Sequence, residues 1–155
     1  TCLIDRLPAF ASNRTTRLIK APKLHWLDPA LAAYLGGLHD ETHLAASREA
    51  GALFESMIFH HLKAFASTFT PGIRLHYWRT MKGSEVDLVL EWGRRITAVE
   101  VKLTDSPRQA DCEGLEAFFK DHPEASGGIL VHTGRNVMRM GTKIIALPWT
   151  TLAGL

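Results

Sequence analysis

The feature that most constrains this chain is a pair of strand-like runs joined by a two-residue turn. Residues 85–92 read EVDLVLEW and residues 95–103 read RITAVEVKL, with Gly93-Arg94 between them. Both runs are rich in the aliphatic and β-branched residues that strands favour. A two-residue loop with glycine first suits a type II′ hairpin turn. We therefore expect an antiparallel hairpin in which opposed residue numbers sum to 187, beginning with Trp92 opposite Arg95.

This register gives each of the four charges inside the hairpin a definite partner. Strand alternation places Glu85 and Asp87 on one face of the first strand, and Glu100 and Lys102 on one face of the second. Asp87 then falls opposite Glu100, and Glu85 opposite Lys102, with Cβ atoms about 4.5–5.5 Å apart. Facing carboxylates repel each other but hold Mg²⁺ well. Such an ion can polarise a phosphoryl oxygen and supply a hydroxide nucleophile, while the ammonium steadies developing charge.

The alternative interpretation is an edge hairpin whose charged face is simply solvated, as is common in antiparallel sheets. Val89, Ile96 and Ala98 share the predicted charged face, so that face is not uniformly polar. A third carboxylate, Glu55, comes from the strongest predicted helix, residues 51–67. This helix has an apolar stripe at helical spacing, formed by Phe54, Ile58, Leu62 and Phe65 and widened by Leu53 and Met57. Glu55 flanks the stripe and could reach the hairpin if the helix packs across it.

The rest of the chain predicts an α/β fold with a mixed sheet flanked by helices. The core order is a helix, a three-stranded antiparallel meander, a helix and a strand. Asp28-Pro29 predicts a helix start and Gly36-Gly37 its end. Ser106-Pro107 predicts the start of a second helix that runs to about Asp121. The remaining expected elements are strands over 2–10, 15–27, 73–80, 127–133 and 143–148, weak helix over 39–50, and a turn with a short strand before 143.

Composition narrows the function classes without selecting one. The net charge is +2, but residues 1–24 carry a net charge of +4 and the remainder −2. This basic N-terminal stretch either binds phosphate or an acidic partner, or is a solvated surface. The longest uncharged apolar segment, residues 29–38, is about half of a bilayer span. With no signal peptide and two distant cysteines, Cys2 and Cys112, we expect a cytoplasmic protein. Because the chain starts at Thr1, we expect it to be part of a longer protein.

Other charged groups give weaker indications. His39 and His43 have the i, i+4 spacing of a helical ligand pair, but no third ligand accompanies them, so we do not predict a zinc site. Four basic residues near the ends of the meander could contact phosphates, although solvated loop charges would look the same; they are Arg79, Lys82, Arg94 and Arg95.

A helix glutamate, then E-V-D on one strand and E-V-K on the next, resembles the PD-(D/E)xK signature of restriction-endonuclease-like nucleases. The resemblance implies that Asp87 and Glu100 are metal ligands for Mg²⁺ or Mn²⁺ and that Lys102 is the catalytic lysine. It also implies that Glu55 is an auxiliary catalytic acid. Val86 stands where the strict motif has proline.

A narrower resemblance covers nearly the whole chain. RLIKAPKLHWLDPALAAYLGGL, GALFESMI, YWRTMKGSEVDLVLE and ITAVEVK are similar to the C-terminal domain of unknown function 4143 of bacterial and archaeal AAA-type ATPases. The resemblance implies an N-terminal ATPase domain elsewhere in the protein, since no G-x-x-x-x-G-K-[ST] motif occurs here. Residues 1–27 would be the tail of a winged-helix-like linking segment, and 28–155 a restriction-endonuclease-like domain.

Two hypotheses of function follow. The first is a metal-dependent nuclease, or a nuclease-derived DNA-binding module, that acts beside the ATPase domain. The second is a catalytically silent interaction module that relays contact with DNA or a partner to the ATPase.

Overall fold

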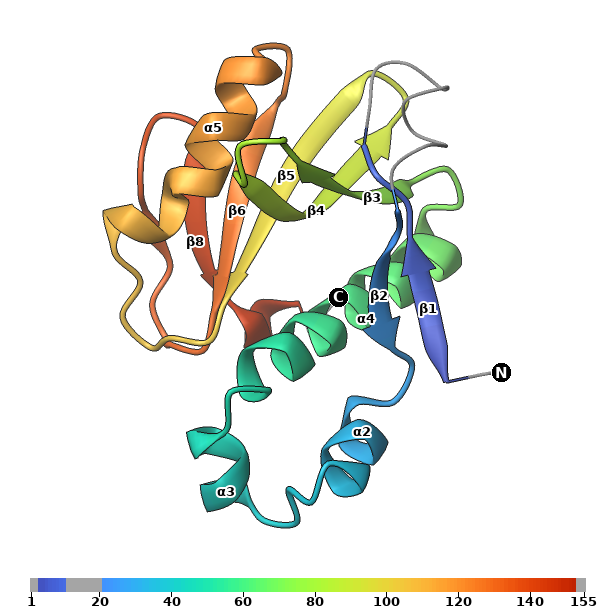
Figure 1. The fold of residues 1–155 in the computed structure, drawn as a ribbon. Coiled ribbons are helices and arrows are strands. Elements are labelled where there is room, and N and C mark those ends of the chain that lie inside the picture. Colours follow the sequence, from blue (N-terminus) through green and yellow to red (C-terminus); the bar gives the residue numbers. More distant parts are fainter. Residues whose placement is uncertain (1–2, 11–20, 153–155) are drawn as a thin grey trace.

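The computed structural model describes residues 3–10 and 21–152 and contains two sheets (Figure 1). The larger is six-stranded, in the order β3-β4-β5-β6-β8-β7. Its strands are β3 (Arg74–Arg79), β4 (Glu85–Trp92), β5 (Arg95–Lys102), β6 (Gly127–His132), β7 (Met138–Arg139) and β8 (Ile144–Pro148). The smaller sheet pairs β1 (Ile4–Leu7) with β2 (Lys23–Trp26).

The larger sheet is mixed, as the sequence predicts. β3, β4 and β5 form an antiparallel meander, whereas β5 pairs with β6 and β6 with β8 in parallel. Parallel strands are usually covered on both faces, and the middles of β5 and β6 are correspondingly apolar and buried. The expected α/β class with a meander, a helix and a further strand is confirmed at this level.

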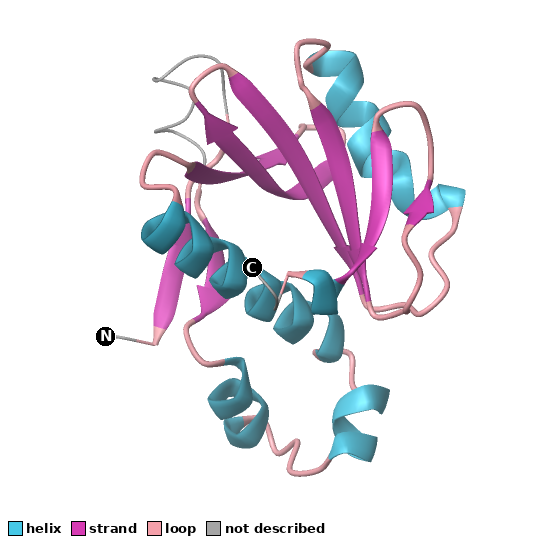
Figure 2. Ribbon diagram, turned by 180° about the vertical axis from the view of Figure 1, so that it is seen from behind, coloured by secondary structure: helices cyan, strands magenta, loops and turns pink. Residues whose placement is uncertain are grey.

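Helices cover the two faces of the large sheet (Figures 1 and 2). α4 (Ala50–Phe69) packs on one face, where its buried Phe54, Ile58 and Leu62 meet the apolar side chains of β4, β5 and β6. α5 (Glu113–Asp121), preceded by the 3-10 turn η1 (Gln109–Cys112), packs on the other. Two short helices, α2 (Pro29–Leu35) and α3 (Glu41–Ala46), lie beyond α4, and the 3-10 turn η2 (Trp149–Thr151) follows β8.

Two of the predicted helix boundaries can be compared directly. Asp28 caps α2 through a hydrogen bond from the Leu31 amide to its carboxylate, as predicted. The predicted start at Ser106-Pro107 is wrong, because the first helical turn begins only at Gln109. There the Asp111 carboxylate accepts a hydrogen bond from the Arg108 amide, and this local cap fixes the start.

The predicted hairpin register is confirmed from the turn to Leu88. Trp92 pairs with Arg95, and the sum of 187 continues to Leu88 opposite Val99. Gly93 has φ of +59°, whereas no non-glycine residue in the described part of the chain has positive φ. Positive φ at only the first central residue agrees with a type II′ turn.

Strict alternation along β4 fails at Asp87. Against β3, paired residue numbers shift by one between His76–Val89 and Trp78–Val86, which marks a β-bulge in β4. Val86 therefore packs with Val89 on the α5 side, while Leu88 packs on the α4 side. Strict strand alternation, which would put Val86 and Leu88 on one face, is therefore wrong here, because the bulge inserts an extra residue.

The small β1–β2 sheet lies beside α4 and β3 (Figure 1). The chain after β1 is tied to β3 by hydrogen bonds of 3.0 Å from the Tyr77 amide to the Pro8 carbonyl and 2.6 Å from the Phe10 amide to the Tyr77 carbonyl. The start of β2 is tied to the same strand because the Tyr77 hydroxyl donates to the Ala21 carbonyl at 2.6 Å. The strand expected over 15–27 is present from Lys23; residues 15–20 lie outside the described part of the chain.

Candidate functional site

Glu100 and Lys102 lie at the end of β5, on the face covered by α5. Lys102 Nζ is 2.8 Å from Glu100 Oε1. The Glu100 side chain is 8% exposed, and its Oε2 has no hydrogen-bond partner. Both line a polar cleft of about 420 Å³ with Ser84, Glu85, Asp111 and Glu113. A buried carboxylate oxygen without a donor is the kind of atom that a cation or a water would satisfy.

The cleft is narrow because the first turn of α5 approaches β4 closely at Gly114. A Cβ atom at this position would lie 2.3 Å from the Glu85 carbonyl oxygen and 3.3 Å from Glu100 Oε2. Only glycine permits this approach without a shift of the backbone. Gly114 therefore keeps the Glu100 carboxylate shielded from solvent.

Asp87 lies on the other side of the bulge, toward β2 and α4. Its Oδ2 accepts a hydrogen bond of 2.9 Å from the Val101 amide, and its Oδ1 is 2.9 Å from Lys23 Nζ. The two pairs predicted to oppose each other, Asp87–Glu100 and Glu85–Lys102, lie beyond the last paired residues of the β4–β5 ladder. Asp87 is therefore not paired with Glu100 in the ladder, but its charge still acts on that carboxyl group.

Lys23 is the functional residue that the sequence did not reveal. Its ammonium is 2.8 Å from Glu55 Oε1, 2.7 Å from Glu85 Oε1 and 2.9 Å from Asp87 Oδ1. An ammonium has three N–H donors, so each can serve a different carboxylate. Lys23 thus brings together Glu55 from α4 and both acids of β4. The predicted convergence of Glu55 with the hairpin therefore occurs through this lysine.

The electrostatics of the cluster follow from its burial. Burial raises the pKa of Glu55, and the Asp87 charge raises it further, to about 7 despite Lys23. Burial and the Asp87 charge likewise raise the pKa of Glu100 to about 7 against the opposing effect of Lys102. Burial alone would lower the pKa of Lys23, but the carboxylates of Asp87 and Glu55 outweigh it and raise that pKa.

The ammonium groups of Lys23 and Lys102 and the guanidinium of Arg79, 3.5 Å from Glu85 Oε2, face four carboxylates here, so the cluster carries a formal charge of −1 when all are ionised. Such a balance suits a divalent cation, and carboxylate oxygen is the donor type that Mg²⁺ and Mn²⁺ prefer. Asp87, however, has both oxygens engaged. Within residues 3–10 and 21–152, no group of three or more His, Cys, Asp or Glu side chains is arranged to hold a metal ion. The donor chemistry fits such an ion, but the carboxylates are not arranged around one while Lys23 holds an oxygen of Asp87.

His25 packs beneath the same cluster. Its ring stacks on Phe59 with centroids 4.3 Å apart, and its Nε2 lies 3.8 Å from Glu55 Oε1. Burial lowers the pKa of His25 to about 4, helped by the positive charge of Lys23. A neutral, buried ring supports the position of β2 rather than adding charge.

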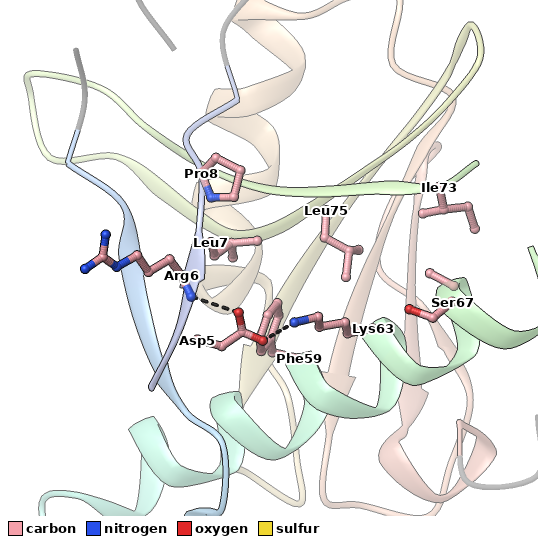
Figure 3. A pocket seen from close by; sticks show the side chains of 10 residues that line it. Asp5, Arg6, Leu7, Pro8, Phe59, Lys63, Ser67, Ile73 and Leu75 are labelled. Atoms are coloured by element: carbon pink, nitrogen blue, oxygen red, sulfur yellow. Dashed lines mark hydrogen bonds and ion pairs between the residues drawn. The ribbon is translucent and has the colours of Figure 1, made fainter. Parts of the chain in front are cut away.

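Other residues considered from the sequence lie elsewhere. His43 contacts Asp40, and His39 packs against Tyr34, so the spacing of the histidines reflects no shared ligand. A separate cavity of about 230 Å³ lies between β1, α4 and β3, where Lys63 of α4 pairs with Asp5 of β1 (Figure 3). No helix in the described part of the chain is long and apolar enough to cross a bilayer.

Comparisons with known proteins agree with the sequence resemblance. Uncharacterized proteins of Mycobacterium tuberculosis (Rv2008c) and Mycobacterium bovis (Mb2031c) are each 30% identical to this chain over 146 residues. The alignment covers 94% of this chain but only 32% of each relative, so the chain spans about a third of their length.

A solved complex of Thermococcus gammatolerans McrB AAA+ hexamers with bound McrC contains a chain that is similar over 63% of this one and 27% of its own length. The TM-score is 0.47 and the identity 13%, values too low to support an argument about function.

The sequence profile of one family, described as a domain of unknown function (DUF4143), matches residues 50–152. This stretch includes α4, the charged hairpin, α5 and the strands that follow. The chain therefore belongs to the DUF4143 family.

Proposed function

We propose that this domain is a nuclease-like module that binds Mg²⁺ or Mn²⁺ at Asp87 and Glu100 and hydrolyses DNA phosphodiesters. In the longer protein it would act beside an N-terminal ATPase domain in the cytoplasm. The observation that carries the proposal is the buried Glu100 carboxylate, whose Oε2 has no partner, next to Lys102 and within the electrostatic reach of Asp87. The E-V-D and E-V-K motifs, which resemble those of restriction-endonuclease-like nucleases, support the proposal.

Each residue has a role that its surroundings support. Glu100 and Asp87 would hold the metal ion, which when bound would polarise the phosphate and lower the pKa of a bound water. Lys102 keeps its proton, because the Glu100 carboxylate outweighs the effect of burial and raises the lysine pKa. A protonated lysine in the cleft can bind a phosphate oxygen and stabilise the negative charge that develops during hydrolysis. Glu55 would act as an auxiliary acid from α4.

A second candidate function is favoured by a different observation. Lys23 pairs with Glu55, Glu85 and Asp87 at 2.7–2.9 Å, which gives the acidic cluster a structural partner. A module held in this way could bind DNA or a partner protein and relay that contact to the ATPase without cleaving anything.

The nuclease function is tested by incubating supercoiled plasmid and a labelled oligonucleotide duplex with the chain, each in Mg²⁺ and in Mn²⁺, and measuring cleavage. The native chain is expected to cut, and Asp87→Ala and Lys102→Ala to lose the activity. Lys120→Ala and Asp121→Ala are matched controls that remove the same charges at the exposed end of α5 and should cut like the native chain. No cleavage by the native chain, with retained DNA binding, would favour the silent module.

A further inference from the structure

Lys23 reaches the acidic cluster from outside the large sheet. It belongs to β2, which pairs with β1 in a two-stranded sheet, and it lies 62 residues before Glu85 and 64 before Asp87. The Lys23 side chain is 22% exposed, so water reaches it. The ammonium therefore comes from a strand that belongs to a different sheet from β4, the strand that carries Glu85 and Asp87.

The three oxygens around the ammonium are of the donor type that a divalent metal ion prefers, although they are not arranged as a metal site while Lys23 is in place. They lie 2.7–2.9 Å from Nζ, whereas Mg²⁺ binds oxygen at about 2.0–2.1 Å and Ca²⁺ at about 2.3–2.6 Å. A divalent ion in the same position would require each oxygen to move inward by less than about 1 Å. Side-chain rotation alone covers such a distance, provided that the ammonium leaves.

A second observation shows that the cluster as a whole is short of positive charge. Even with Lys23 and Lys102 in place, the Oε2 atom of Glu100 is buried without a hydrogen-bond partner. The cluster thus already holds one cation, the ammonium, and still has a carboxylate oxygen unsatisfied nearby. Both facts point to a divalent ion as the ligand that would balance it.

We propose that Lys23 is an internal competitor of the metal: its ammonium occupies a cation position formed by Glu55, Glu85 and Asp87, and a divalent ion takes that position when Lys23 withdraws. The proposal builds on the proposed function, since Asp87 also belongs to the nuclease-like site. It adds Glu85 as a ligand and makes β2 the element that regulates metal occupancy.

Calorimetric titration with Mn²⁺ alone tests the competition. Lys23→Met keeps the length and apolar character of the stem but removes the ammonium, and it is expected to bind Mn²⁺ at least tenfold more tightly than the native chain. Lys63→Met is the matched control, because Lys63 also ties the β1–β2 sheet to α4, through Asp5, without touching the cluster (Figure 3). It should bind Mn²⁺ like the native chain. Equal or weaker binding by Lys23→Met would overturn the proposal.

Removal of Lys23 also leaves Glu55 and Asp87 without its positive charge and leaves Glu85 with Arg79 alone, so thermal unfolding provides a second readout. Mn²⁺ should raise the Tm of Lys23→Met by more than it raises that of the native chain or of Lys63→Met. If Lys23→Met folds only when Mn²⁺ is present, the proposal is supported. If Mn²⁺ leaves its Tm unchanged, the proposal is wrong.

Chemical labelling of the native chain tests the withdrawal directly. An amine-specific acetylating reagent, followed by mass spectrometry, should modify Lys23 faster in saturating Mn²⁺ than in its absence, with Lys63 unchanged. Mn²⁺ that binds without exposing Lys23 would overturn the proposal but leave the proposed function intact. If Lys23→Met binds Mn²⁺ more tightly but neither it nor the native chain cleaves DNA, the competition is supported and the proposed nuclease activity is contradicted.

Discussion

Replacement of Gly114 by alanine should separate α5 from the hairpin and weaken the fold. The new Cβ would lie 2.3 Å from the backbone oxygen of Glu85, a separation that real Cβ atoms essentially never show. Relief requires the first turn of α5 to retreat by about 1 Å, because the obstructing atom is main chain rather than a flexible side-chain end. Overpacking of this kind costs about 1–3 kcal/mol. For a chain of this size, that cost corresponds to a fall in Tm of roughly 2–12 °C.

Gly51→Ala is the matched control for this substitution. Gly51 lies in the first turn of α4, and an added Cβ there would meet nothing within 4 Å. Alanine should therefore leave stability unchanged or raise it by up to about 1 kcal/mol through helix propensity. Urea unfolding followed by circular dichroism measures both variants. If Gly114→Ala is as stable as Gly51→Ala, α5 does not approach the backbone of β4 as closely as the structure shows.

Three further substitutions test the packing and the charge of the site. The pKa of Glu100 is raised to about 7 from an ordinary value of 4.5, so its protonated form favours folding; the resulting stability is present below pH 4.5 and is lost as the pH rises through 7. In urea unfolding experiments, the native chain should lose roughly 2–3 kcal/mol more stability between pH 5 and pH 8 than Glu100→Gln does. An equal loss in both proteins would contradict the raised pKa of the buried Glu100 carboxyl group. Leu115→Ala should cost about 2–5 kcal/mol, because Leu115 is fully buried on the inner side of α5, whereas Leu24→Ala at a 58% exposed position should cost well under 1 kcal/mol. Tyr77→Phe removes the hydrogen bond to the Ala21 carbonyl and should cost about 1 kcal/mol in the same assay, with no change expected if that bond is not formed in solution.

The parts of the fold that local sequence determines could be predicted. The hairpin register follows from one turn, since Gly93 supplies the positive φ and fixes which residues oppose each other as far as Leu88. The apolar spacing in α4 predicts which side chains are buried, and the structure confirms Phe54, Ile58 and Leu62. These features depend on contacts between neighbours in the sequence or on the period of one helix.

The site itself could be predicted only in part, because its arrangement depends on distant segments. The bulge at Asp87 arises from pairing between β4 and β3, and the alternation of β4 alone gives no sign of it. Beside the bulge, Asp87 contacts Lys23 of β2 and the backbone of β5. Lys23 could be noted only as part of a basic N-terminal stretch, since nothing local relates it to acids more than 60 residues later. The assignment of residues 1–27 to a separate linking segment stays a prediction.

The central claim is that the carboxylates of β4 and β5 bind one divalent cation. Calorimetric titration of the native chain with Mn²⁺, beside Asp87→Asn and Glu100→Gln, tests it most directly, because both variants remove a negative charge with little change in shape. We expect the native chain to bind one ion and both variants to lose that binding. No binding by the native chain, or unchanged binding by both variants, would contradict it.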